Sequence, residues 1–393
     1  MLVITLTKAV PSRTTQVVTA GGVLRREAME LVLNPHDSKA FEAGDYVKRA
    51  LGGKHIAISM GPHPKLIPLA MPLYHSQVQG VDEVYILSDR RMAGADTWAT
   101  SYTLARGIKK VLDVHIAALE ELRKLIEGGA PLEQVSEKAR ELYRKNLLPN
   151  RIYSELPPVR DHLIARLASG ALTREEVLRE LEGMKEELGL IIIFAGIKTT
   201  DGETGSTGPQ VAEALSHLLG RIVGHITFVL EFSLADSGRE VVALRRIGSY
   251  LQRLAGPLPM LLTIAPSYRP PPISASTRPQ ARLNNYRGKT PQPIVWDAAA
   301  IEAEPDKIGL AGSPTLVGPG VDIGRPPVRK FVGRSLVFAE DLPALSWDGQ
   351  SLGPFKRGEL ADALPQELKE RLRAEGKLTT FTLNMLVEEV FGR

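Results

Sequence analysis

The sequence predicts an α/β fold in which a largely parallel sheet is covered by helices on both faces. Short, uninterrupted apolar runs alternate with helical patterns over residues 1–111 and resume after residue 188. Strands of this kind are typical of parallel sheets that are buried on both faces. The chain has 393 residues, of which 43% are hydrophobic, so it can bury a substantial core.

The elements of the first half follow from these patterns in chain order. Apolar runs bounded by polar residues or glycine predict strands, and apolar residues repeated every three or four positions predict helices. Pro68 and Pro72 interrupt one of the helical stretches. We expect strands at 2–10, 54–61 and 81–89, and helices at 34–51, 64–80 and 97–112.

The next segment, 112–187, interrupts this alternation. It is rich in Glu, Lys, Arg and Leu and contains no strand pattern. Helices are expected at 112–129, 131–147 and 173–188, and a capping box from Thr173 to Glu176 opens the last of them. We interpret the segment as a helical insertion, which either adds packing or provides a docking surface for a partner.

The sheet is expected to resume at 188–196 and to continue with strands at 225–232, 240–247 and 260–265. The strands at 225–232 and 240–247 are joined by a short polar stretch and resemble an antiparallel hairpin. From Pro266 the chain is rich in proline and arginine, which predicts an extended arm, and helices follow at 364–376 and 380–392. The predicted domains are 1–111 with 188–265, 112–187, and 266–393.

The composition excludes several classes of function. The chain has no cysteine, which removes disulfides, cysteine-ligated clusters and thiolate catalysis. A net charge of +4 spread along the chain does not imply a nucleic-acid partner. Neither a signal peptide nor a membrane helix is indicated, so we expect a cytoplasmic protein that could reach a membrane through a partner complex. The sequence predicts no metal site and no catalytic residue, which favours chemistry carried by a cofactor.

A glycine-rich loop before a predicted helix is the strongest local sign of a ligand site. Its glycines repeat every third residue, and it lacks the lysine of a phosphate-transfer loop. Its amides and hydroxyls suit a phosphate or diphosphate that is held without being transferred, although a plain turn that caps the helix is the alternative. The residues concerned are Thr199, Thr200, Asp201, Gly202, Glu203, Thr204, Gly205, Ser206, Thr207, Gly208, Pro209 and Gln210.

The two carboxylates of this loop need a separate explanation. Asp201 and Glu203 would repel a phosphate if they pointed toward it. We therefore expect them to bond ribose hydroxyls, a flavin, the loop backbone or a neighbouring subunit.

A second polar loop, "LSDRRMAGADTWATS" at 87–101, follows the strand 81–89. In open α/β sheets ligands bind beyond the carboxyl ends of the strands, and this loop lies at that edge. Its glycine allows a close approach of the backbone, while two of its polar residues could instead cap the helix that follows. The candidate binding residues are Asp89, Arg90, Gly94, Asp96, Thr97 and Thr100.

Other strand ends and a nearby turn add polar or glycine residues at the same edge of the sheet. Several loops would therefore converge on one site, which is stronger support than any single loop gives. The additional candidates are Leu6, Thr7, Lys8, Asn34, Asp37, Met60 and Gly61.

Three segments resemble the β subunit of electron transfer flavoproteins. They are the first strand followed by "NPHDSKAFEA", the strand ending in "SMGP", and "AGIKTTDGETGSTGPQVAEAL". The resemblance covers roughly residues 1–111 and 188–335, and the third segment is the most specific. It implies a Rossmann-like, α-hydrolase-like domain that binds an adenine nucleotide, a partner α subunit, and a C-terminal arm and helices that contact that subunit.

A further segment, "SDRRMAGADTWATSYTLA", resembles the Fix-type and bifurcating branch of this family. That branch implies FAD in this subunit, whereas the ordinary branch holds a structural AMP. It also implies hydride transfer from NADH. One electron would pass to ferredoxin or flavodoxin, and the other would pass through the α-subunit FAD to a quinone oxidoreductase or acyl-CoA dehydrogenase.

By family position, Leu6–Lys8 and Met60 would line the nucleotide, Asn34–Asp37 would lie beside it, and residues 199–210 would wrap it. Two features depart from the family pattern. The insertion at 112–187 replaces a short turn, so we expect it to contact another subunit or a membrane-associated partner. The partner-recognition loop would fall within Tyr268–Lys289, which is unusually rich in arginine and proline here. Besides the FAD-binding and the AMP-binding flavoprotein subunits, a third hypothesis is a nucleotide-sensing protein without a redox role, similar to universal stress proteins.

Overall fold

The structure of the chain is a computed structural model. The residues that it describes are 1–12, 19–20, 23–24, 30–51, 53–75, 80–149, 151–155, 161–271, 292–315 and 335–382. They fall into two compact units, 1–319 and 320–393, and each unit is described by itself. None of the helices in the described ranges is long and apolar enough to cross a membrane.

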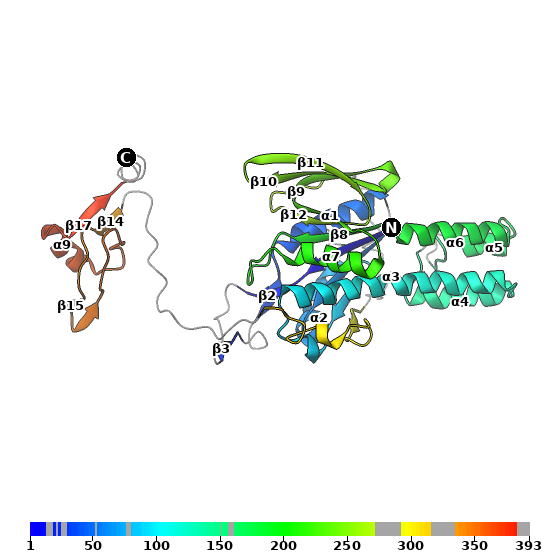
Figure 1. The fold of residues 1–393 in the computed structure, drawn as a ribbon, viewed down its shortest axis with the longest axis horizontal. Coiled ribbons are helices and arrows are strands. Elements are labelled where there is room, and N and C mark those ends of the chain that lie inside the picture. Colours follow the sequence, from blue (N-terminus) through cyan, green and yellow to red (C-terminus); the bar gives the residue numbers. More distant parts are fainter. Residues whose placement is uncertain are drawn as a thin grey trace. The chain divides into compact units, whose positions relative to one another are not determined.

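The first unit is built on a nine-stranded sheet with the order β11-β10-β9-β12-β8-β1-β6-β7-β13 (Figure 1). The seven strands from β9 to β13 in that order run parallel, and β10 and β11 add an antiparallel edge. The strands are β1 (Leu2–Thr7), β6 (Lys54–Met60), β7 (Glu83–Leu87), β8 (Ile191–Gly196), β9 (Gly224–Ala235), β10 (Glu240–Ile247), β11 (Tyr250–Pro257), β12 (Met260–Ile264) and β13 (Ile294–Trp296). The predicted fold class and the β9–β10 hairpin are confirmed.

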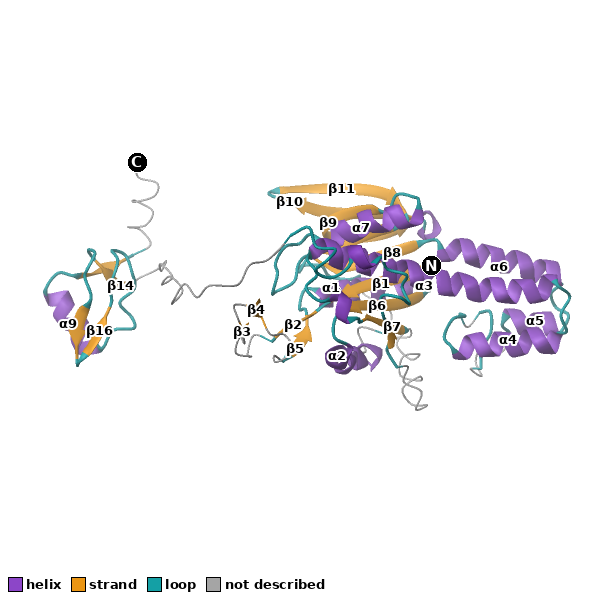
Figure 2. Cartoon of the chain, turned by 60° about the horizontal axis from the view of Figure 1, so that its bottom comes forward, coloured by secondary structure: helices purple, strands orange, loops and turns teal. Residues whose placement is uncertain are grey.

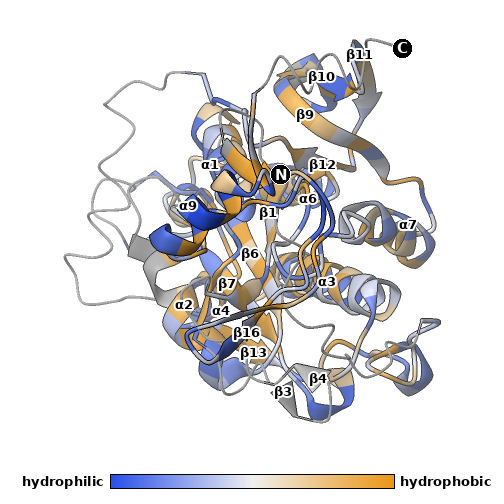
Figure 3. Cartoon of the chain, turned by 90° about the vertical axis from the view of Figure 1, so that its left-hand side faces the viewer, coloured by the Kyte–Doolittle hydropathy of each residue, from blue (hydrophilic) through white to orange (hydrophobic). Residues whose placement is uncertain are grey.

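Helices cover both faces of this sheet. The helices of the α/β body are α1 (Asp37–Leu51), α2 (His63–His75), α3 (Thr97–Glu127) and α7 (Thr207–Leu219). Ile4 of β1 packs in the core with α3 and α7, and Val3 packs in the core with α1. All six residues of β1 are buried, as expected for a central strand between two helical layers. Apolar residues concentrate in the central strands β6 and β7 (Figure 3).

Short strands accompany the main sheet. Strands β2 and β5 pair antiparallel, as do β3 and β4. Their bounds are β2 (Ala9–Pro11), β3 (Thr19–Ala20), β4 (Val23–Leu24) and β5 (Leu31–Leu33).

The helical insertion has its own apolar core. Helices α4 (Leu132–Arg144), α5 (Leu163–Ala168) and α6 (Arg174–Leu188) lie beside the distal half of α3 and project with it from the body (Figures 1 and 2). The predicted capping box is present, because Thr173 and Glu176 bond each other's backbone amides at 3.2 and 2.8 Å. The predicted separation into helices 97–112 and 112–129 is wrong, since α3 continues without a break.

Helix α3 is continuous because nothing in its sequence stops a helix before Gly128. Val111 and Leu112 pack in the core of the body, and Leu119 and Leu122 pack in the core of the insertion. Gly107 lies within the helix, where a Cβ atom would come within 2.7 Å of the Leu87 side chain. One helix therefore belongs to two apolar cores.

Both edge strands of the main sheet lie where the sequence predicted no strand, and one of them falls within the predicted arm. Strand β13 joins the main sheet beside β7, because its three residues pair with Tyr85, Ile86 and Leu87. Strand β11, which the sequence did not predict, forms the opposite edge and exposes Tyr250 and Leu251. The predicted partner-recognition loop, Tyr268–Lys289, lies outside the described residues from 272 onward.

The second unit contains a small α+β fold. Its elements are β14 (Ser335–Phe338), β15 (Leu345–Trp347), β16 (Gln350–Leu352), α9 (Gln366–Ala374) and β17 (Leu378–Phe381). Phe338 and Phe355 stack at 4.3 Å in its core, and Arg371 lies over the Trp347 ring. The helix predicted at 364–376 is confirmed by α9. The one predicted at 380–392 is wrong at its start, where Thr380 and Phe381 pair with β14, and residues 383–393 lie outside the described part.

A buried charged cluster joins the body to the insertion at the amino ends of the strands. The Glu83 carboxyl accepts hydrogen bonds from Lys54 Nζ at 2.5 Å and Tyr85 Oη at 2.6 Å. Lys54 also bonds the carbonyl of Asn146 and lies 3.1 Å from Nε2 of His115 on α3. Burial alone would raise the pKa of Glu83, but Lys54 and His115 lower it to about 2.

We expect Glu83→Gln to lower the free energy of unfolding at pH 7 by roughly 3–5 kcal/mol, because it leaves the Lys54 ammonium without its carboxylate. The depressed pKa means that Glu83 stabilises the fold above about pH 4.5 and that this contribution is lost as the pH falls toward 2. Chemical denaturation at several pH values measures both effects.

Glu141→Gln is the matched control, because Glu141 forms ion pairs with Lys138 and Lys145 on the exposed surface of the insertion. Exposed pairs contribute little to stability. Equal effects of the two substitutions would contradict the role assigned to the buried cluster.

Candidate functional site

The predicted site residues lie along one edge of the sheet. Strands β8, β1, β6 and β7 are adjacent and parallel, so the loops that follow them meet at their carboxyl ends. Leu6 and Thr7 end β1, and Met60 ends β6. The amide of Gly61 donates to the carbonyl of Leu87 at 3.0 Å, which holds the ends of β6 and β7 together.

A buried polar junction connects the first strand, the 34–37 turn and the end of β8. The Asp37 carboxylate accepts hydrogen bonds from the Lys8 amide at 2.9 Å and from Asn34 Nδ2 at 2.8 Å. Asn34 Nδ2 also donates to the carbonyl of Lys198 at 2.9 Å. At Gly196 a Cβ atom would lie 2.5 Å from Asp37 Oδ1, so only glycine permits this approach. Burial raises the pKa of Asp37 to about 7, although these hydrogen bonds oppose the shift.

An ion pair fastens the glycine loop to the same junction. Lys8 Nζ lies 2.9 Å from both carboxylate oxygens of Asp201. Asp201 also accepts a hydrogen bond from the Gly202 amide at 2.8 Å. Among the roles expected for Asp201, the structure shows a bond to the loop backbone, and its main partner is Lys8. Glu203 pairs with Lys198 at 3.1 Å and is exposed.

The glycine loop ends at the amino terminus of α7. This helix begins at Thr207, within the segment 199–210 predicted as the glycine loop. Ser206 precedes it but forms no side-chain cap, so the first amides of α7 lack the usual intrahelical and capping partners. Gly208 packs against Thr263, where a Cβ atom would come within 2.7 Å. An uncapped helix start next to a glycine loop is a suitable anion site.

The loop residues differ in exposure. Gly202, Glu203 and Thr204 are exposed, and Gly208 is buried. The others are half-buried, namely Thr199, Thr200, Asp201, Gly205, Ser206, Thr207, Pro209 and Gln210.

The second loop, 89–97, uses its carboxylates to stabilise its own conformation. Asp89 caps the short 3₁₀ helix Arg90–Met92 and pairs with Arg91 at 2.6 Å, and this hydrogen-bonded guanidinium lowers the pKa of Asp89. Asp96 is the N-cap of α3, accepting a hydrogen bond from the Ala99 amide at 2.9 Å. The cap interpretation therefore describes Asp96, while Arg90 and Gly94 are exposed.

Residues outside the predicted set also contribute to this edge. Ser101 of α3 donates to the carbonyls of Thr97 and Thr207, at 2.6 and 3.2 Å, and so connects the two loops. Ser313 and Thr315 bond Asp96 from a distant part of the chain. Local sequence patterns carry no signal for these long-range contacts, although Ser101 belongs to the polar stretch that drew attention to 87–101.

The edge retains unused hydrogen-bonding capacity that fits a nucleotide cofactor. The Ser59 hydroxyl and the side-chain oxygen Oδ1 of Asn34 are buried without a hydrogen-bond partner among the described residues. Buried polar atoms are normally paired, so such atoms indicate a ligand or water. Together with the uncapped start of α7, they offer donors and acceptors for phosphate and hydroxyl groups. The described residues contain no cluster of potential metal ligands.

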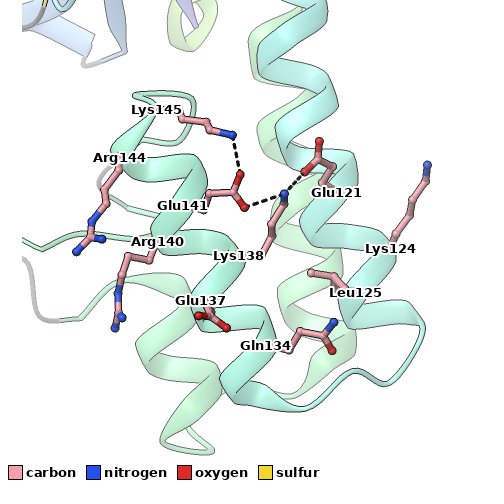
Figure 4. A pocket seen from close by; sticks show the side chains of 10 residues that line it. All are labelled: Glu121, Lys124, Leu125, Gln134, Glu137, Lys138, Arg140, Glu141, Arg144 and Lys145. Atoms are coloured by element: carbon pink, nitrogen blue, oxygen red, sulfur yellow. Dashed lines mark hydrogen bonds and ion pairs between the residues drawn. The ribbon is translucent and has the colours of Figure 1, made fainter.

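A large groove of about 950 Å³ lies on the insertion between α3 and α4, away from this edge (Figure 4). Four of its side chains pair with each other, since Lys138 binds Glu121 at 2.7 Å and Glu141 at 3.0 Å. Lys145 also binds Glu141. None of the predicted binding residues lines this groove, so the strand-end edge remains the candidate site.

Comparisons with known proteins show which chains this one is similar to. An electron transfer flavoprotein domain matches residues 21–120. Protein FixA of Azorhizobium caulinodans is 24% identical over 82% of this chain and 83% of its own length. An electron transfer flavoprotein subunit beta of Thermoanaerobacterium thermosaccharolyticum is 23% identical over 75% of this chain and 77% of its own length.

A shorter match has higher identity. Subunit CarD of the caffeyl-CoA reductase–Etf complex of Acetobacterium woodii is 42% identical over 27% of this chain, a stretch that spans 39% of that protein. The domain match and the two longer relatives together confirm the resemblance to Fix-type electron transfer flavoprotein β subunits.

We expect the difference in unfolding free energy between Asp37→Asn and the wild type to depend on pH. A raised pKa means that the native state holds a proton that the unfolded state has lost, so wild-type stability falls as the pH rises from about 4 to 7. Asparagine does not titrate, and the variant should gain on the wild type by roughly 4 kcal/mol across this range.

Urea denaturation of the α/β body at several pH values measures this difference. Asp113→Asn, at an accessible helix ion pair with Lys109, is the matched control. A pH-independent difference between Asp37→Asn and the wild type would show that folding does not raise the pKa of Asp37.

Proposed function

Because the chain is a Fix-type relative of the electron transfer flavoprotein β subunits, we propose that it is the β subunit of a heterodimeric electron transfer flavoprotein that binds FAD at the carboxyl edge of its sheet. The observation that carries this proposal is the meeting of the glycine loop, the uncapped α7 and the loop 89–97 at one edge. A nucleotide as long as FAD can contact all three features, whereas the shorter AMP can contact fewer of them.

The residues of this edge suggest how the cofactor is held. The amides of the glycine loop and of the α7 start would bind the diphosphate. Lys8 neutralises Asp201 and so keeps a carboxylate from repelling it. The buried Asn34 and Ser59 oxygens would bond hydroxyl groups of the nucleotide.

The loop 89–97 would lie beside the ring end of the cofactor. Gly94 permits a close approach of the backbone, and the exposed Arg90 would place a cation near the ring. A cation there stabilises an anionic reduced ring. When bound, FAD supplies the capacity to accept a hydride and to release electrons singly, and the chain supplies position and electrostatics.

We further propose that NADH is the donor and that the electron pair is divided. One electron would go to a low-potential acceptor such as ferredoxin or flavodoxin. The other would go through the α-subunit FAD to a quinone oxidoreductase or an acyl-CoA dehydrogenase. The support is the similarity of the 88–105 segment to the bifurcating branch. The alternative is an ordinary carrier with AMP here, which shuttles electrons from dehydrogenases to the quinone pool.

Two surfaces are suited to partner chains. The tip of the β10–β11 hairpin exposes Ile247, Tyr250 and Leu251, and β11 is the last strand of the sheet. An exposed apolar edge strand is a template for pairing with another chain, so we assign this edge to the α subunit. The C-terminal residues 266–393 remain a further proposed α-subunit contact.

The helical insertion is assigned to a different partner. It has its own core and an outer surface of paired charges, so its fold does not depend on the hairpin edge. We propose that it contacts an additional subunit or a membrane-associated acceptor complex.

We expect the purified heterodimer to contain two FAD per αβ pair and to be reduced by NADH. Extraction of the cofactors, chromatography and quantification against protein measure this ratio directly. One FAD together with one AMP would establish the ordinary carrier instead, and a colourless complex would favour the nucleotide-sensing hypothesis.

Shortening the insertion should separate its role from that of the hairpin. A glycine–serine linker in place of residues 117–186 keeps His115 and the part of α3 that packs on the body. We expect αβ pairing and nucleotide content to be retained, and binding of the further partner to be lost, as measured by co-purification and light scattering. Assembly identical to that of the wild type would show that the insertion only adds packing.

A further inference from the structure

A segment after β13 packs against α3 and the loop 89–97 of the candidate site. We call residues 297–315 the strap. Residues 301–304 of the strap are bound to α3, where Arg106 Nε donates to the carbonyl of Ile301 at 2.9 Å and Lys110 pairs with Glu302 at 3.0 Å. The Glu304 amide also donates to the Tyr102 hydroxyl at 3.2 Å. The strap therefore runs along the first turns of the helix that follows the loop 89–97.

Residues on both sides of this part of the strap are bound to the loop itself. The Ala298 amide donates to Asp89 Oδ2 at 3.2 Å, and the Leu310 amide donates to the carbonyl of Ala93 at 3.0 Å. The Asp96 amide donates to the Ser313 hydroxyl at 2.8 Å. Contacts are thus spread over the whole loop rather than confined to one end.

The approach of the two segments is close enough to require glycine. Gly309 has a φ of +55°, and a Cβ atom there would lie 1.9 Å from the carbonyl oxygen of Arg91. On the loop side, a Cβ atom at Gly94 would come within 3.3 Å of Leu310. Gly309 therefore keeps the strap in direct contact with the loop backbone, and Gly94 leaves room for the Leu310 side chain.

Asp96 links the strap to the start of α3 through its two carboxylate oxygens. Oδ1 caps the helix at the Ala99 amide, and Oδ2 accepts from the amide and the hydroxyl of Thr315, at 3.1 and 2.6 Å. This arrangement commits both oxygens to the protein. It also means that the conformation of the loop depends on residues more than 200 positions later in the sequence.

We propose that the strap positions the loop 89–97 for the ring end of the bound cofactor, with Ser313 and Thr315 as positioning residues. The proposal rests on the proposed function, because it takes the ligand to be a flavin nucleotide. The bonds described above join the strap to the loop 89–97 and to α3, whereas residues 199–210, which would hold the adenosine and phosphate end, belong to a separate loop. The strap should therefore control the affinity for FAD and have little influence on the affinity for AMP.

The test compares the full chain in its complex, stripped of nucleotide, with the double variant Ser313→Ala/Thr315→Val. We expect the Kd for FAD to rise about tenfold and the Kd for AMP to change by less than twofold, both measured by titration calorimetry. The single variant Thr315→Ser should keep most of the wild-type FAD affinity, because its hydroxyl can still donate to Asp96. Lys307→Gln, which removes an ion pair within the strap, is the matched control and should bind both nucleotides as the wild type does.

Amide hydrogen exchange of the peptide 89–99 provides a readout that needs no cofactor. We expect several-fold faster exchange in the double variant and unchanged exchange in Lys307→Gln. Unchanged exchange in the double variant, or equal losses of FAD and AMP affinity, would overturn the proposal. A wild-type chain that binds neither nucleotide would instead refute the proposed function, and the exchange measurement would still decide whether the strap positions the loop.

Discussion

A buried carboxyl, that of Asp37, joins three segments that are far apart in the sequence. It binds the amide after β1, it is held by Asn34 in the turn before α1, and it touches the backbone at the end of β8 through the gap left by Gly196. Burial makes an unpaired charge costly, so these hydrogen bonds determine where the segments can lie. The positions of Lys8 and of the glycine loop depend on this junction, and so does the geometry of the site edge.

The acidic residues around the site share one electrostatic arrangement. Asp201 is paired with Lys8, Asp89 with Arg91, and Asp96 with backbone and hydroxyl donors. Each carboxylate is thereby satisfied by the protein before any ligand arrives. Backbone amides and hydroxyl groups remain available to an anion, and they bind phosphate without the repulsion that the loop composition at first suggests.

Local patterns were sufficient for much of the fold. Uninterrupted apolar runs identified the central strands, and the capping box at Thr173 identified the start of α6. They could not show that α3 is a single helix, because its break was inferred from a change in composition and not from a stop signal. Strand β11 was missed since an exposed edge strand lacks an apolar pattern, and the strap was missed because its contacts to Asp89 and Asp96 are long-range.

The continuity of α3 has a consequence for how such an insertion can vary in length. A helix turns by about 100° and rises 1.5 Å with each residue. One residue added between Leu112 and Leu119 would rotate the whole insertion by that angle about the helix axis, while the end at Asp96 stayed in place. Four added residues would nearly restore the direction and shift the insertion by about 6 Å. The direction of the insertion therefore depends on helical phase as well as on the buried cluster around Lys54, and changes of three or four residues disturb that direction least.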